Sequence, residues 1–143
     1  MRYTSLLAII ALSLALSCAA PAAAPGEPAN AEMDAFIGNA AVLSPSGPAT
    51  VTAGGEFAVV LEENVSTGYR WTYTAAPADL ATETGRESFG PPAQPMVGAP
   101  VVTVWKFTAK TEGQVTLTYL YYRPWEKPET AVKRLAYTVK IVK

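Results

Sequence analysis

Apolar and polar residues alternate with a period of two in one segment after another, and no other feature constrains the fold as much. The pattern covers residues 56–63, 69–74, 101–109, 114–122 and 134–142. Side chains of a β-strand point alternately to its two faces, and Val, Thr, Tyr and Trp, which dominate these segments, favour strands. We therefore expect five strands that each turn one face to a core.

Shorter strands are expected at 41–43, 50–52 and 82–88, with Gly- and Pro-containing turns between the segments. In total this predicts an all-β chain of about seven to eight strands, and it favours an immunoglobulin-like β-sandwich over a closed barrel. Helical signals are weak. The segment 31–36 is expected to form one helical turn at most, because short isolated helices are marginal.

Composition excludes several classes of function. The formal net charge is −1, so no cationic footprint for nucleic acid or an anionic membrane surface is expected. The chain contains no His, which removes His-based acid–base catalysis and His-ligated metals. Cys18 is the only cysteine, so no disulfide can form within the chain. We expect no catalytic residues, no metal site and no cofactor.

The N-terminus resembles a bacterial lipoprotein signal. Arg2 precedes an apolar run from Leu6 to Leu16, which is too short to span a membrane as a mature helix. Small Ser17 and then Cys18 follow this run, where cleavage leaves a cysteine that can carry lipid. The alternative is an ordinary secretory signal that is cut near residues 22–24.

This interpretation divides the chain into three parts. Residues 1–17 are the signal, residues 18–33 form an Ala- and Pro-rich tether, and residues 34–143 form the β-sandwich domain. We expect an exported protein that is anchored in the cell envelope, in the periplasm or at the outer membrane, only through a lipid on Cys18. With an ordinary signal, the protein is instead secreted.

Three loops interrupt the strand pattern: loop one (residues 64–68), loop two (residues 90–100) and loop three (residues 123–129). Loops of a sandwich gather at its two ends, so the three can share one end. Loop one can be an ordinary turn, shaped by Asn64 and by a positive φ at Gly68. Trp125 in loop three can either fold back onto the sandwich or serve as an exposed anchor for a partner.

The loops resemble those of the chagasin-like inhibitors of papain-like cysteine proteases. "NVSTGYRW" (residues 64–71) is similar to the family signature N-P-T-T-G-[YF]-x-W, and "RPWE" (residues 123–126) matches its R-P-W element. The "VWKF" strand (residues 104–107) lies where the family has a strand after a Gly-rich loop. The resemblance covers roughly residues 40–143. Val65 replaces the usual proline, and Gly98-Ala99-Pro100-Val101 keeps only the first glycine of the family's G-x-G-G motif.

The resemblance implies an inhibitor whose partner is a papain-like cysteine protease, and we expect the protein to be a monomer. Loop one is implied to enter the catalytic cleft and the other two loops to straddle it. The protease-binding residues implied are Asn64, Val65, Ser66, Thr67, Gly68, Tyr69, Gly98, Ala99, Pro100, Arg123, Pro124 and Trp125.

Two other classes of function compete with this one. An envelope-anchored binding or adhesion module could use the same sandwich for a partner that is not a protease. An enzyme is the weakest alternative, because the acidic residues read as solvated charges of strand ends and loops; they are Glu62, Glu63, Glu83, Glu87 and those between Glu126 and Glu129.

Replacing Cys18 with Ser is expected to abolish lipidation and to yield soluble or unprocessed protein, because serine cannot accept the thioether-linked lipid. Metabolic labelling with palmitate checks this, with the wild-type chain as the positive control. Absence of label on the wild-type chain would contradict the lipoprotein interpretation and leave the ordinary secretory signal.

Overall fold

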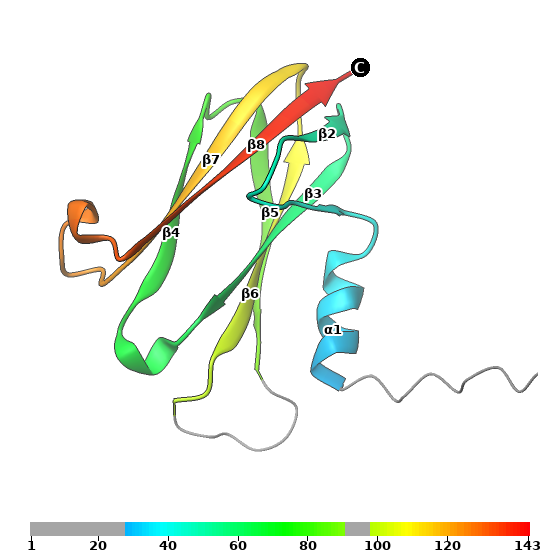
Figure 1. Cartoon of the computed structure of the whole chain (residues 1–143). Coiled ribbons are helices and arrows are strands. Elements are labelled where there is room, and N and C mark those ends of the chain that lie inside the picture. The colour runs from blue at the N-terminus through cyan, green and yellow to red at the C-terminus, as the bar shows by residue number, and fades with distance from the viewer. Residues whose placement is uncertain (1–27, 91–97) are drawn as a thin grey trace, which may run out of the picture.

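The computed structural model describes residues 28–90 and 98–143 (Figure 1). Cys18, the signal segment and most of loop two therefore lie outside the described residues. The elements are α1 (Pro28–Ile37), β1 (Ala41–Val42), β2 (Ala49–Thr52), β3 (Glu56–Glu63), β4 (Arg70–Ala76), β5 (Ala81–Phe89), β6 (Val101–Ala109), β7 (Gly113–Tyr122) and β8 (Lys133–Val142), with single 3-10 turns at Val65–Thr67 and Pro128–Thr130. None of the helices in these ranges is long and apolar enough to cross a membrane.

Eight strands form two four-stranded sheets, which confirms the predicted β-sandwich. The first sheet has the order β1-β3-β6-β5, and the second has the order β2-β8-β7-β4. The long strands pair antiparallel, whereas β1 pairs parallel with β3 and β2 pairs parallel with β8. The chain thus crosses between the sheets after β1, and each sheet gains a short strand at one edge (Figure 1).

The core between the sheets is aromatic, and it follows from the predicted alternation. Tyr119 on β7 is fully buried, and its ring packs against four others: Trp71 at 6.5 Å between ring centroids, Tyr73 at 5.3 Å, Trp105 at 5.2 Å and Tyr137 at 5.7 Å. Aromatic contacts of this kind add to the free energy gained by burial alone. The aromatic contacts therefore hold together the strands from which the loops leave.

The helix α1 is longer than the single turn predicted for residues 31–36, and it begins at Pro28, within the range assigned to the tether. Met33, Phe36 and Ile37 pack on the outer face of the first sheet, and the rings of Phe36 and Phe89 lie 5.9 Å apart. This packing supplies the stability that local helix propensity lacks. Val104 on β6 is fully buried in the same cluster.

Two stacked tyrosines provide a matched pair for testing the core. The Tyr119 hydroxyl has no hydrogen-bond partner among the described residues, whereas the Tyr73 hydroxyl donates to Glu83 Oε2 at 2.7 Å. Burial raises the pKa of Tyr119 well above its usual value. Burial and the hydrogen bond to Glu83 together raise the pKa of Tyr73 to about 12.

Replacing Tyr119 with Phe is expected to leave the free energy of unfolding unchanged or to raise it by up to about 1 kcal/mol, since a buried hydroxyl without a partner is removed. The control, Tyr73→Phe, is expected to lose about 1 kcal/mol or more, because it deletes a hydrogen bond to a carboxylate. Urea denaturation measures both. A larger loss for Tyr119→Phe than for Tyr73→Phe would contradict this account.

Candidate functional site

Loop one forms a compact turn that its own side chains hold together. Asn64 Oδ1 accepts hydrogen bonds from the backbone N of Ser66 at 3.1 Å and from Ser66 Oγ at 2.6 Å. Thr67 Oγ1 donates to the Asn64 carbonyl at 2.6 Å, and Gly68 ends the turn with a φ of 79°. The turn predicted from Asn64 and Gly68 is therefore confirmed, and it exposes Val65, Ser66 and Thr67 at its tip.

The adjoining strands brace the base of loop one. Arg70 Nη1 donates to the carbonyls of Val65 at 3.1 Å and Tyr69 at 2.8 Å. The backbone N of Asn64 donates to the Tyr121 hydroxyl at 3.0 Å, and Trp71 Nε1 donates to the Glu62 carbonyl at 2.9 Å. Hydrogen bonds from β4, β7 and the end of β3 therefore brace the base of the turn that carries the tip.

Loop three lies directly against loop one. Trp125 is 72% exposed, so the alternative that it joins the core is wrong. Its ring lies so close to Gly68 that a Cβ at position 68 would be 2.6 Å from the ring carbon Cη2. Arg123 lies 4.7 Å from the centre of the Tyr69 ring and pairs with Glu126 at 3.5 Å. The two sequence motifs thus form one surface.

The described end of loop two touches the other side of loop one. Asn64 Nδ2 donates to the Gly98 carbonyl at 2.9 Å, and Gly98 takes a φ of 89°, which glycine adopts readily. Ala99 is half-buried and Pro100 is exposed. Loop one, loop three and the described end of loop two therefore lie together at one end of the sandwich, an arrangement that the sequence spacing left open (Figure 1).

Glu63, at the base of loop one, corrects a prediction, because it is only 8% exposed and not a solvated charge. Its Oε1 accepts a hydrogen bond from Thr103 Oγ1 at 2.9 Å, and the Thr103 and Ser88 hydroxyl oxygens are 2.8 Å apart. This chain of bonds ties β3 to β6 and β5, the strands that lead into loops one and two. Sequence reasoning missed it because a glutamate at a strand end has the same pattern whether it is buried or exposed.

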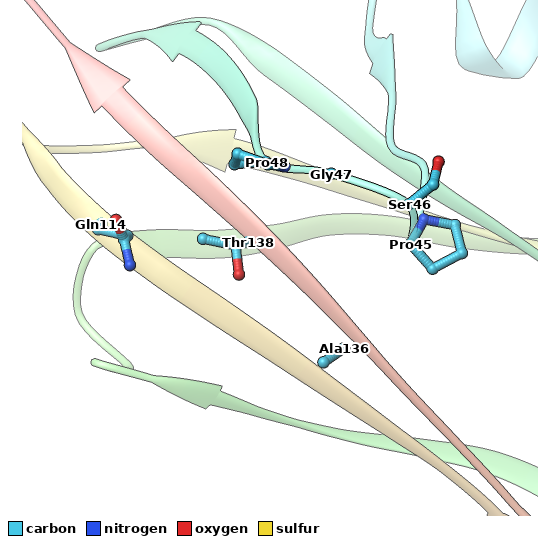
Figure 2. Close-up of a pocket in the computed structure, with 7 residues that line it drawn as sticks. All are labelled: Pro45, Ser46, Gly47, Pro48, Gln114, Ala136 and Thr138. Carbon is cyan, nitrogen blue, oxygen red and sulfur yellow. The ribbon is translucent and has the colours of Figure 1, made fainter.

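Loops one and three present hydroxyl, amide and aromatic groups at this end of the sandwich. These groups are suited to noncovalent binding of a partner. Within residues 28–90 and 98–143, no group of three His, Cys, Asp or Glu residues could hold a metal ion. A depression lies elsewhere, on the outer face of the second sheet (Figure 2); its lining residues are Pro45, Ser46, Gly47, Pro48, Gln114, Ala136 and Thr138. It shares no residue with the three loops.

Comparison with known families identifies a relationship over most of the domain. The family model described as "Chagasin family peptidase inhibitor I42" matches residues 50–141, well over half of the chain. The match runs from β2 into β8 and includes all three loops, whereas α1 lies outside it. No curated protein matches the chain in sequence.

Several solved structures are similar to this one, including the following two. The crystal structure of the cysteine protease inhibitor EhICP2 from Entamoeba histolytica is 26% identical, with a TM-score of 0.63, and the alignment covers 71% of this chain and 95% of that one. The solution structure of Amebosin is 20% identical, with a TM-score of 0.59, and the alignment covers 73% of this chain and all (100%) of that one. The second likeness concerns the fold alone.

Replacing Gly68 with Ala is expected to displace the Trp125 ring, because the new Cβ would overlap it. The control is Gly54→Ala. Gly54 also has a positive φ, of 83°, but apart from its two chain neighbours nothing lies within 4 Å of the added Cβ. Both variants are expected to lose about 1 kcal/mol or more of stability from the left-handed backbone. Only Gly68→Ala should shift the indole N–H resonance of Trp125 in a ¹H–¹⁵N spectrum. An unchanged Trp125 resonance would contradict the packing of the two loops.

Proposed function

The chain belongs to the chagasin family of peptidase inhibitors, and on that premise we propose that it is a reversible, tight-binding inhibitor of papain-like cysteine proteases. The observation that carries the proposal is the joining of the three loops into one surface with a small, exposed tip at its centre. Loop one enters the catalytic cleft of the protease, and loops two and three contact the surface on either side of it.

Hydrogen bonds within loop one favour inhibition over cleavage at the Asn64–Val65 and Val65–Ser66 peptide bonds. The Asn64 carbonyl accepts bonds from the N and Oγ1 of Thr67, at 3.2 and 2.6 Å. The Val65 carbonyl accepts bonds from the N of Gly68 at 3.3 Å and from Arg70 Nη1 at 3.1 Å. Cleavage requires a carbonyl that is free to enter the protease's oxyanion hole. These two carbonyls are directed into the inhibitor instead.

The same bonds favour tight binding. A loop that is already ordered loses little conformational entropy when it binds, so more of the contact energy contributes to affinity. Trp125 supplies a large, exposed, aromatic anchor beside the tip, and such residues dominate the energetics of protein interfaces. Protease–inhibitor complexes bury about 1,600 Å² in total, an area that three adjoining loops can provide.

The proposal also includes the cellular location of the inhibitor. The signal-like N-terminus supports export, with a lipid on Cys18 as the membrane anchor and a monomeric domain outside the cytoplasm. Inhibition of a protease at the envelope needs no other contact with the membrane.

The function is tested by titrating papain with residues 19–143 and following hydrolysis of a fluorogenic peptide. Stoichiometric, reversible loss of activity, without cleavage of the added chain, supports the proposal. Full papain activity in the presence of excess folded protein would contradict it and favour a binding module for a partner that is not a protease.

Replacing Thr67 with Arg is expected to weaken inhibition at least tenfold, about 1.4 kcal/mol of binding free energy, because a bulky cation cannot enter a narrow cleft. Thr67→Ser keeps the hydroxyl that bonds to Asn64 and should bind like the wild type. Thr50→Arg, an exposed threonine on β2 outside the loops, is the matched control and should inhibit normally. The inhibition constant and melting temperature are measured for each variant. Equal inhibition by Thr67→Arg and Thr50→Arg would show that loop one stays outside the cleft.

A further inference from the structure

Charge is segregated between the two sheets, although the whole chain is nearly neutral. The first sheet and α1 carry a net charge of −5 from seven carboxylates and two cations: Glu32, Asp34, Glu56, Glu62, Glu63, Glu83 and Glu87, against Arg86 and Lys106. The second sheet, with loop three and the residue after β8, carries +5 from seven cations and two carboxylates: Arg70, Arg123, Lys127, Lys133, Arg134, Lys140 and Lys143, against Glu126 and Glu129.

Ion pairs do not cancel this separation. Arg86 pairs with Glu83 at 3.0 Å, and Lys106 pairs with Glu56 at 3.1 Å, so both cations of the first sheet are bound by its own carboxylates. Across the described parts of the chain, no ion pair joins one sheet to the other. The charge of the domain is therefore asymmetric, with a negative side at the first sheet and a positive side at the second.

The positive charge of the second sheet is concentrated beside loops one and three. We call Arg70, Arg123, Lys127, Lys133 and Arg134 the cationic edge. The strand register places Arg70 opposite Tyr122, and Lys133 opposite Tyr121, at the end of the second sheet from which loop three leaves. Lys127, Lys133 and Arg134 are exposed and take part in none of the ion pairs found among the described residues.

The cationic edge is continuous with the binding surface. Arg123 lies over the Tyr69 ring at 4.7 Å, directly after loop one, and Arg70 donates to the Val65 carbonyl at the tip. Exposed Glu62 and Glu87 lie on the first sheet, toward the strand ends that lead into loops one and two. A protease that approaches the three loops thus meets positive charge on the loop-three side and negative charge on the other.

We propose that the cationic edge recognises an acidic surface of the target protease, next to the cleft on the side that loop three contacts. This inference rests on the proposed function and deepens it by giving the chemistry of the partner. Complementary charge at the rim of an interface raises the association rate constant and selects the orientation of the encounter. The edge therefore steers the inhibitor so that loop one arrives at the cleft and not beside it.

Papain and succinylated papain are the probes, because succinylation converts lysine ammonium groups into carboxylates and makes the same protease more acidic. Association rate constants are measured by stopped flow at 0.01 and 1 M salt, after active-site titration of each enzyme. The edge variant is Lys133→Glu with Arg134→Glu. The control is Lys140→Glu with Lys143→Glu, which makes the same change in net charge at the far end of β8. Melting temperatures verify that both variants are folded.

With succinylated papain at low salt, the wild type is expected to associate at least tenfold faster than the edge variant, and the control is expected to stay within about twofold of the wild type. At 1 M salt the difference should largely vanish, because the screening length falls to about 3 Å. The milder pair Lys133→Gln with Arg134→Gln should fall between the wild type and the edge variant.

Equal association of the edge variant and the control would overturn the proposal. So would loss of binding to phosphatidylserine vesicles by the edge variant with unchanged association to the protease, which would assign the edge to a membrane surface. If the wild type inhibits neither form of papain, the proposed function fails and this inference fails with it. Normal inhibition without a charge effect contradicts this inference alone.

Discussion

The arrangement of the loops depends on the hydrogen bonds of the Asn64 side-chain amide. Its oxygen accepts two bonds from Ser66 and shapes loop one, while its nitrogen donates to the Gly98 carbonyl and fastens loop two. On the opposite side, Gly68 leaves room for the ring of Trp125. Loop one therefore connects the two flanks of the surface, through Asn64 on the side of loop two and through Gly68 on the side of loop three.

The sandwich holds the strands from which these loops leave. Tyr119 and its ring neighbours fix β4, β6, β7 and β8 relative to one another. The buried hydrogen bond between Glu63 and Thr103, with the partly buried one between Thr103 and Ser88, links β3, β6 and β5 just beneath loops one and two. Burying a carboxylate is costly unless it is hydrogen-bonded. The hydrogen bond from Thr103 compensates for the burial of the Glu63 carboxylate, and it lies where loops one and two leave their strands. This links the packing of the fold to its proposed function.

Much of the fold could be predicted from the sequence, because strand faces follow from local alternation: Val115, Leu117 and Tyr119 all point into the core. The turn at Asn64 and the positive φ at Gly68 were also readable, since they depend on neighbouring residues. The helix α1 and buried Glu63 were not, because both depend on partners far along the chain, Phe89 and Thr103. For the same reason, the sequence named the three loops but could not show that Asn64 touches Gly98.

The central claim is that three adjoining loops form one surface for a protease. Hydrogen exchange of the backbone amides, measured on the free chain and on its complex with catalytically blocked papain, tests it most directly. The account predicts slower exchange in the complex at residues 65–69, 98–99 and 125–127, with no change around residues 44–47 beside the depression of Figure 2. Protection confined to the depression or to α1, with unchanged exchange in the three loops, would contradict it.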